Sequence, residues 1–240
     1  MNRDSNLYTF IFASIMVIAV ASSLALTHSS LKEKQKDNVR NEKMQNILAT
    51  IGIYTSRESA EEIYTKHIVE ELSLKIDGTN DQSVSTFNIS LNQELKKPDS
   101  EQRYPLYVAS VDKDKFYIVP LRGAGLWDAI WGYIALENDF KTIKGVVFDH
   151  KSETAGLGAE ITQDWFQDSF KGEKILDKKN NLVGIDVSKT NNDPKGLDKE
   201  DNQVDYISGA TITGDGVSDM ISERLEKYTC LLYTSPSPRD

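Results

Sequence analysis

The chain has 240 residues, of which 39% are hydrophobic and 27% are charged, and its formal net charge is −9. A chain of this length can bury the core of one or two domains. The acidic balance, with no stripe of Lys and Arg interleaved with aromatic residues, excludes a nucleic-acid partner, because phosphate binding requires a basic surface.

The first predicted element is a membrane-spanning helix. Leu7 to Leu26 is a run of 20 residues without a charge, and as a helix it would be about 30 Å long, which matches the hydrocarbon core of a bilayer. We therefore assign residues 1–6 to a cytoplasmic N-terminus and residues 7–27 to a transmembrane helix. The alternative is a cleaved signal peptide ending near Ala21. The apolar run continues beyond that site and favours a retained anchor.

The charges beside this helix conflict with export of the rest of the chain. Only Arg3 precedes the apolar run, whereas five basic residues follow it, diluted by three acidic ones. This bias points locally against export, although long domains translocate regardless of it. We expect residues 28–229 to form one domain outside the cytoplasm.

Two helices are predicted next, over residues 31–50 and 58–75. Ser56 or Ser59 would cap the second, in which apolar residues recur at helical spacing. Residues 76–102 are polar with turn signals, and a short strand near residues 84–90 is compatible with their composition.

The middle of the chain predicts strands. Residues 104–111 and 115–121 form a β-rich hairpin, and two more strands are expected over residues 131–137 and 142–149, joined by a turn at Asn138-Asp139. The remaining predicted elements are a short helix at 162–171, a strand at 181–188 and an amphipathic helix at 215–229 with Val217, Met220, Ile221 and Leu225 on one side. The fold class is therefore α+β, with a mostly antiparallel sheet and flanking helices.

The end of the chain is interpreted as foreign. Residues 230–240, CLLYTSPSPRD, resemble the translation of a sequencing adapter and break sharply from the helical pattern before them, so we assign them to no part of the fold. The alternative is a natural disordered tail. Under the first interpretation the only cysteine, Cys230, is not native, and thiol chemistry is excluded.

Several kinds of functional site are not predicted. The three histidines, His28, His67 and His150, lack metal-ligand spacing, and no metal site is expected. Gly123-Ala124-Gly125 begins like a dinucleotide fingerprint, but Asp128 stands where the pattern needs glycine, and the segment lies between strands. Motifs of zinc proteases, serine hydrolases and Walker-type phosphate loops are absent from the sequence.

Three stretches remain as candidates for chemistry. The glycine–tryptophan loop, residues 121–127 (LRGAGLW), combines close backbone approach with a ring that can stack on a ligand. The Glu153 loop, residues 153–160 (ETAGLGAE), offers backbone amides to a ring or a phosphate. The threonine turn, residues 205–211 (DYISGAT), precedes the last predicted helix, where Thr213 or Asp215 would be the cap. Each alone is compatible with a simple turn.

Together, and behind an N-terminal anchor, the three stretches resemble the FMN-binding domain of the C subunit of the sodium-translocating NADH:quinone reductase. The resemblance covers nearly all of residues 1–229, including the segment 45–49 after the anchor. In that family the pattern D-x-x-S-G-A-T, here Asp205 to Thr211, is the signal for covalent flavinylation.

The resemblance implies that Thr211 carries FMN through a phosphoester to its hydroxyl. A separate, magnesium-dependent flavin transferase would make this bond from FAD outside the cytoplasm, recognising Asp205, Ser208, Gly209 and Ala210. Thr213 is the rival acceptor. A hydroxyl is the group that a phosphoester needs, and amides near a helix start favour the phosphate charge. The further residues expected to bind the cofactor are Gly123, Gly125, Leu126, Trp127, Glu153, Thr154, Gly156, Leu157, Gly158, Ser208, Gly209 and Ala210.

The resemblance also implies a role as electron carrier. The chain would have no catalytic residue of its own and would relay electrons through FMN within a sodium-pumping complex of the bacterial inner membrane, its flavin domain on the periplasmic side and its partners the other subunits. The sequence departs from the family pattern at two places. Ala155 stands where proline is common, and Arg122 precedes Gly123 while Ala124 stands between Gly123 and Gly125. The alternatives are the G subunit of the related Rnf complex, an anchored noncatalytic binding protein, and a free-standing FMN domain.

Overall fold

The structure, a computed structural model, describes residues 5–190 and 196–228. The predicted cytoplasmic N-terminus and the adapter-like segment 230–240 with Cys230 therefore fall largely or wholly outside the described residues. The chain divides into two units, residues 1–43 and residues 44–240.

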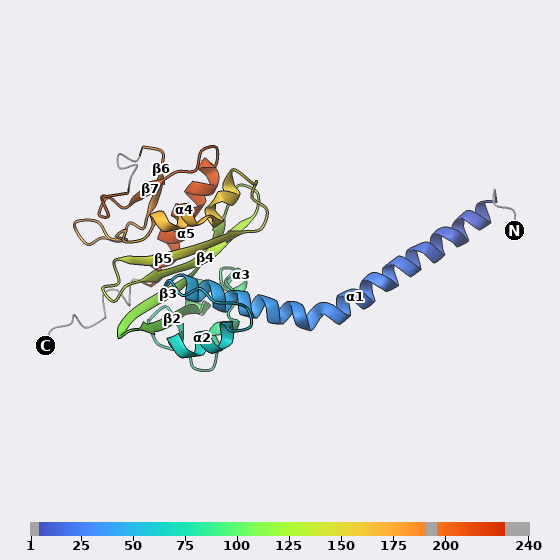
Figure 1. The fold of residues 1–240 in the computed structure, drawn as a ribbon, viewed down its shortest axis with the longest axis horizontal. Helices are drawn as coiled ribbons and strands as arrows, with labels where there is room; N and C mark the ends of the chain where they lie inside the picture. Colours follow the sequence, from blue (N-terminus) through green and yellow to red (C-terminus); the bar gives the residue numbers. More distant parts are fainter. Residues whose placement is uncertain (1–4, 191–195, 229–240) are drawn as a thin grey trace. The chain divides into compact units, whose positions relative to one another are not determined.

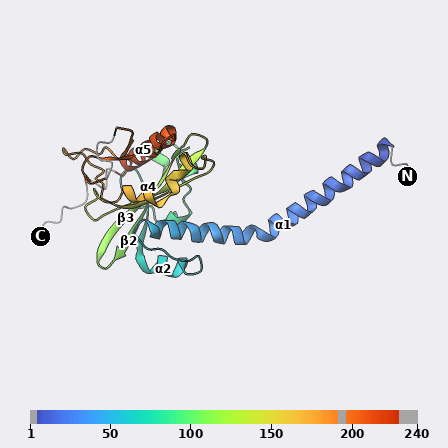
Figure 2. The same ribbon diagram turned by 45° about the horizontal axis from the view of Figure 1, so that its top comes forward.

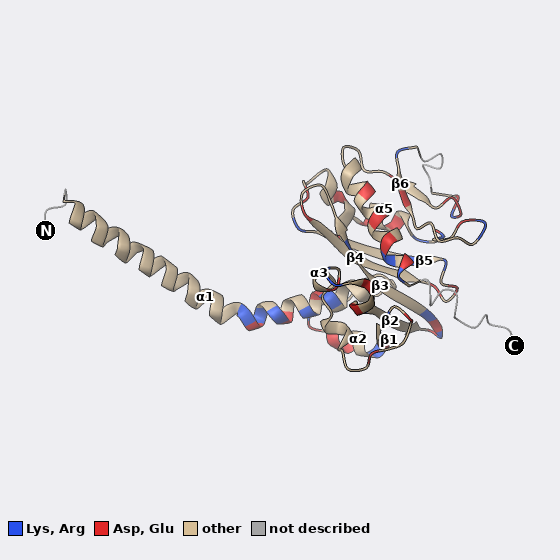
Figure 3. Cartoon of the chain, turned by 180° about the vertical axis from the view of Figure 1, so that it is seen from behind, with Lys and Arg blue, Asp and Glu red and all other residues tan. Residues whose placement is uncertain are grey.

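The first unit is the greater part of one long helix, α1 (Asn6–Ala49). It is long and apolar enough to cross a membrane, by length and composition, and its apolar side chains, such as Phe10 and Val17, are exposed. Charged side chains begin only after this apolar part, at Lys32 (Figure 3). The helix predicted over residues 31–50 continues the apolar helix without a break.

The second unit is organised around a five-stranded antiparallel sheet in the order β1-β2-β3-β4-β5. Every strand pairs with its neighbour in sequence, so the sheet is a meander. The strands are β1 (Ile68–Leu74), β2 (Tyr104–Val111), β3 (Asp114–Ala124), β4 (Ala129–Leu136) and β5 (Ile143–His150). The two predicted hairpins are confirmed, with pairs such as Tyr107↔Ile118 and Ile134↔Val146.

Both faces of the sheet are buried. Alternate residues of a strand point to opposite faces, and Leu106 and Tyr107 accordingly belong to different core clusters. One face is covered by the end of α1, with Ile47 and Leu48 fully buried, and by α2 (Ala60–His67). The other face is covered by α4 (Asp164–Ser169) and α5 (Thr211–Glu226). The two ribbon views agree that α4 and α5 lie together, apart from α2 (Figures 1 and 2).

The remaining elements are short. Three 3₁₀ turns, η1 (Thr86–Asn88), η2 (Asp99–Glu101) and η3 (Gly158–Thr162), accompany the one-turn helix α3 (Leu91–Glu94). Two three-residue strands, β6 (Asp186–Ser188) and β7 (Gln203–Asp205), form a parallel pair. The predicted class, an antiparallel sheet with flanking helices behind a long apolar helix, is confirmed.

Four local predictions were wrong. The helix predicted over 58–75 ends at His67, because Ile68 and Val69 begin strand β1, and pairing with β2 outweighs the helical spacing. Ser59 is its N-cap position but makes no side-chain cap bond. Residues 84–90 form η1 instead of a strand, since Thr86 turns its hydroxyl to Ser73. The strand predicted over 181–188 is limited to β6, and β7 was not foreseen.

The fourth difference matters for function. The last helix begins at Thr211, four residues before the predicted start, because the amide of Gly214 donates to Ala210 O at 2.9 Å. The predicted apolar face is confirmed, with Val217, Met220 and Ile221 buried. Thr211 is therefore the first residue of a helix and not part of a free loop.

Candidate functional site

The threonine turn is a tight turn that leads directly into α5. The amide of Ala210 donates to Ile207 O at 3.0 Å, and Gly209 has φ of +77°, a left-handed conformation that glycine adopts without strain. A Cβ on Gly209 would also lie 2.7 Å from Leu157 Cδ2, a side chain of the Glu153 loop. Glycine at this position therefore satisfies both a backbone and a packing requirement.

Thr211 and Thr213 differ in what their hydroxyls do. Thr211 is half-buried, and among the described residues no hydrogen bond is made by its hydroxyl. Thr213 is 1% exposed, and its Oγ1 donates to Glu153 Oε2 at 2.7 Å. The hydroxyl of Thr211 is therefore available for bond formation, whereas the hydroxyl of Thr213 is already hydrogen-bonded to Glu153.

The start of α5 has amides available for an anion. Ala210, at the N-cap position, has no side-chain acceptor, and the first turn carries no acidic residue. The first amides of a helix lack intrahelical partners and carry the positive end of the helix dipole. A negative group on the Thr211 hydroxyl would therefore lie beside donors that this helix itself leaves unsatisfied.

The Glu153 loop connects this helix start to the glycine–tryptophan loop. Glu153 is 8% exposed, and its Oε1 accepts the backbone N–H of Trp127 at 3.0 Å while Oε2 holds Thr213. The indole Nε1 of Trp127 donates to Thr154 Oγ1 at 3.2 Å. Three stretches that are far apart in the sequence, and were selected separately as candidates, thus meet at one place.

A pocket of ≈ 200 Å³ lies at this meeting point. Its lining comes wholly from the three stretches and the two residues after Thr211. Leucine and isoleucine side chains on its rim are well exposed: Leu126 is 47% and Ile212 is 57% accessible. The lining residues are Leu126, Glu153, Thr154, Leu157, Gly158, Gly209, Ala210, Thr211, Ile212 and Thr213.

Several predicted site residues lie beside the pocket instead of in its lining. Gly123 packs on α5, where a Cβ would be 2.8 Å from Met220 Cβ. Trp127 is 67% exposed at the rim. The others outside the lining are Gly125, Gly156, Ser208 and Asp205, the last at the end of β7. Ile212 and Thr213 also line the pocket. Ile212 was not predicted as a site residue, and Thr213 was predicted only as the rival acceptor. Their signal, the first turn of a helix, was missed because the helix was predicted to start later.

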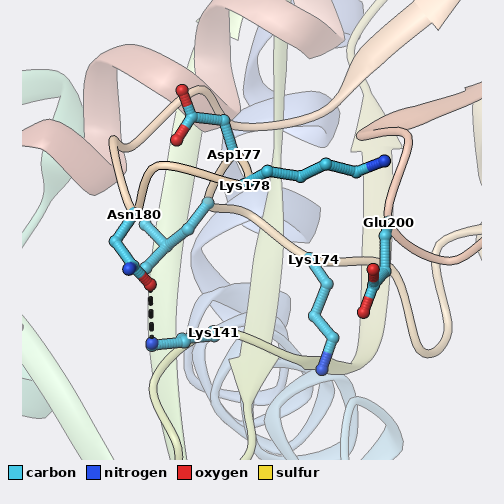
Figure 4. Close-up of a pocket in the computed structure, with 7 residues that line it drawn as sticks. Lys141, Lys174, Asp177, Lys178, Asn180 and Glu200 are labelled. Carbon is cyan, nitrogen blue, oxygen red and sulfur yellow. Dashed lines mark hydrogen bonds between the residues drawn. The ribbon is translucent and has the colours of Figure 1, made fainter.

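A second pocket, of ≈ 240 Å³, shares none of these residues. Three lysines and two carboxylates from the segments before and after β5 surround it (Figure 4). Lys141 Nζ donates to Asn180 Oδ1 and Lys174 Nζ donates to Thr142 Oγ1, both at 2.9 Å. Asp177 bonds within its own turn, to Lys179 and Asn181. The ammonium groups are spread around this pocket and do not converge on one point (Figure 4).

No metal cluster is evident in the described part of the chain. Within residues 5–190 and 196–228, no group of three or more His, Asp or Glu side chains is placed to hold a metal ion. His150 accepts the amide of Glu153 through Nδ1 at 3.2 Å, which places this histidine behind the Glu153 loop as a backbone acceptor.

Comparisons with known proteins point to one family. The family described as FMN-binding domain matches residues 125–226. The C subunit of the Na(+)-translocating NADH-quinone reductase of Haemophilus ducreyi is 28% identical, covering 91% of this chain and 89% of that protein. The same subunit of Pseudomonas aeruginosa is 25% identical over 92% and 91%. The crystal structure of that subunit from Parabacteroides distasonis superposes with a TM-score of 0.76 at 36% identity, covering 85% of this chain and 98% of that chain.

Proposed function

We propose that this chain, which belongs to the family of the C subunit of the Na(+)-translocating NADH-quinone reductase, is an electron-carrier subunit of such a complex. Its pocket lies within the matched FMN-binding domain. The other subunits of the complex are its partners, and the complex is the active translocase. Bound FMN supplies one- and two-electron transfer, while the protein holds the group, orients it and limits its access to water.

We propose further that FMN is attached to Thr211 by a phosphoester. The observation that carries this is the contrast between the two threonines, because only Thr211 has a hydroxyl that is uncommitted among the described residues and partly exposed. The Thr211 oxygen would bond to the FMN-side phosphorus of FAD, supplied by a flavin transferase. The pyrophosphate bond breaks, AMP leaves, and the hydroxyl proton departs to the AMP phosphate or to water. No oxidation or reduction accompanies this step.

The residues present fit a flavin phosphate at this position. The phosphate would lie beside the amides that begin α5, where an N-cap side chain is lacking. The pocket of ≈ 200 Å³ is smaller than the pockets of roughly 300–1,000 Å³ that enclose drug-sized ligands. Bound flavin would therefore be partly enclosed, with Leu126 and Leu157 beside it and one side open to a partner.

The anchor and its orientation are part of the proposal. Helix α1 supplies one single-pass apolar helix, and we assign residues 7–27 to the bilayer, with the FMN-binding domain, residues 28–229, on the periplasmic side of a bacterial inner membrane. The relatives described above bear the name of the quinone reductase, which favours this complex over the related Rnf complex.

The experiment that tests the attachment is intact-protein mass measurement after denaturation. The full chain would be coexpressed with a flavin transferase, beside Thr211→Ala and the matched variant Thr213→Val. We expect a gain of one FMN less one water in the parent chain and in Thr213→Val, and no gain in Thr211→Ala. A gain that survives Thr211→Ala would move the site to another residue. No gain in any chain, with the transferase active on a known substrate, would favour an anchored protein without covalent flavin.

A further inference from the structure

Glu153 occupies the centre of the site but uses both carboxylate oxygens on the protein itself. Oε1 accepts the Trp127 amide at 3.0 Å and Oε2 accepts the Thr213 hydroxyl at 2.7 Å. The side chain is 8% exposed. A buried carboxylate is stabilised by donors of this kind, and hydrogen bonds to a charged group are stronger than neutral ones. Glu153 is thus suited to hold two neighbouring segments in place.

The glycines around Glu153 leave room for this carboxylate. A Cβ on Gly125 would lie 2.5 Å from Glu153 Oε1. A Cβ on Gly158 would collide with Oε2 and lie 2.5 Å from Thr213 Oγ1. Neither glycine has a positive φ, so the requirement is space and not backbone conformation. Two glycines that the sequence analysis placed among the cofactor-binding residues therefore serve close approach of a side chain.

The bond between Glu153 and Thr213 also has the geometry of a base and its nucleophile. Burial argues against that function, because Thr213 is 1% exposed and the phosphorus of FAD would be delivered by a separate enzyme. Thr211, two residues earlier in the same helical turn, is half-buried. The same bond that commits Thr213 fixes the first turn of α5 below the Glu153 loop.

We infer that Glu153 is a positioning residue, which joins the glycine–tryptophan loop to the first turn of α5 and so presents Thr211, and not Thr213, for flavin attachment. This inference rests on the proposed attachment of FMN to Thr211. In this proposal Glu153 does not contact the flavin. The two hydrogen bonds that Glu153 accepts, from Trp127 and from Thr213, are formed before flavin binds and control which threonine is modified.

Three variants separate the hydrogen bonds from the charge. Glu153→Ala removes both bonds. Glu153→Gln loses the charge but can accept from the Trp127 amide and donate to the Thr213 hydroxyl. Glu160→Gln is the matched control, because Glu160 lies on the same loop and accepts the Gly156 amide at 3.1 Å, a bond within that loop.

The test is a time course of flavin attachment to the full chain, with purified transferase, magnesium and FAD, followed by intact mass and peptide mapping. We expect Glu153→Ala to take up flavin at Thr211 roughly ten-fold more slowly than the parent. Glu153→Gln and Glu160→Gln should stay within about two-fold of it. In the double variant Glu153→Ala/Thr213→Val, attachment should be no slower than in Glu153→Ala. Both changes break the same hydrogen bond, between Glu153 and Thr213, so their effects should not add.

A second measurement needs no flavin. Amide hydrogen exchange of the flavin-free chain should show faster exchange at Trp127 in Glu153→Ala, with unchanged protection in strands β4 and β5, and no change in Glu160→Gln. Attachment in Glu153→Ala as fast as in Glu160→Gln would overturn the inference, as would equal slowing in Glu153→Gln and Glu153→Ala. If the parent chain itself takes up no flavin, the proposed function fails, while exchange at Trp127 still tests whether Glu153 joins the two segments.

Discussion

The two pockets lie beyond opposite ends of strand β5 and are built differently. The Thr211 pocket follows the end of β5 at His150, whereas the lysine pocket includes Lys141, just before the strand begins. At about 3.3 Å per residue, the eight residues of β5 span about 23 Å. Around Thr211 the polar groups are buried and bonded to one another, with glycines fitted to them. Around Lys141 they are surface side chains bonded to neutral oxygens.

This difference shows that the Thr211 pocket has a fixed geometry and that the lysine pocket does not. A carboxylate that is buried with two donors has one arrangement, because leaving either donor unsatisfied is costly. Surface ammonium groups on flexible stems have many arrangements of similar free energy. The Thr211 pocket is therefore preorganised, as a cofactor site requires, and we assign no ligand to the lysine pocket.

Among the variants that test this difference between the two pockets, Gly158→Ala is expected to change the free energy of unfolding most. The new methyl group would displace the Glu153 carboxylate and break its bond to Thr213. Crowding and the lost bond together should lower the free energy of unfolding by about 3 kcal/mol. Denaturant titration of the full chain in detergent, followed by tryptophan fluorescence, measures this change.

Gly156→Ala is the control for that variant. Gly156 lies on the same loop with φ of +76°, and a Cβ there would meet no atom within 4 Å. Only backbone strain is expected, of about 1 kcal/mol. If both variants lose the same stability, Glu153 does not crowd Gly158 as the structure indicates, and the contrast between the two pockets weakens.

The sequence predicted the main sheet because its hairpins are local. Strands β2 to β5 each pair with the next strand along the chain, and β-rich runs around short turns identify them. Strand β1 was missed because it pairs with β2 across a separation of some thirty residues, and the helix before it has the same apolar spacing. Tertiary pairing decides between helix and strand at Ile68.

The candidate site was predictable in part from the sequence. The three stretches could be selected from their residues and their family resemblance, and the structure brings them together. What the sequence could not indicate was the partner of each residue. Nothing in the spacing of Glu153 and Thr213, sixty residues apart, predicts their hydrogen bond. The reason why position 158 requires glycine also becomes clear only from that hydrogen bond, because a Cβ there would collide with both of its partners.

An intermediate effect is expected at Glu173, the residue before Lys174 of the lysine pocket. This residue is 0% exposed and its carboxylate pairs with Lys199 Nζ at 2.8 Å, while Oε2 has no hydrogen-bond partner among the described residues. Burial raises the pKa of Glu173 to about 7, against the opposing effect of Lys199, and Asp201 and Asp198 raise it further.

The sign of the pH dependence follows from that shift. Below the ordinary pKa of 4.5, which the unfolded chain has, both states hold the proton. Between that value and about 7 the folded state binds the proton more tightly than the unfolded state, so this contribution to stability is lost as the pH rises. We expect it to fall by roughly 2 kcal/mol between about pH 5 and pH 7.

The variant Glu173→Gln should remove this slope. Denaturant titrations at several pH values would compare it with the parent chain, with Glu200→Gln as a control on the exposed rim of the same pocket. An unchanged slope in Glu173→Gln would show that the buried carboxyl titrates in both states alike.

The smallest effect is expected from the flavin phosphate itself. If FMN is attached at Thr211, its phosphate oxygens accept amides at the start of α5, which has neither an N-cap side chain nor an acidic first turn. A negative group at a helix N-terminus contributes about 1 kcal/mol. Amide exchange at Ile212 and Thr213 should therefore slow by roughly five-fold in the flavinylated chain relative to Thr211→Ala. Exchange in the segment 174–180, beside the lysine pocket, should not change. Equal slowing at both ends of β5 would mean that the flavin stabilises the whole domain, and the two pockets would not be independent as their separate linings suggest.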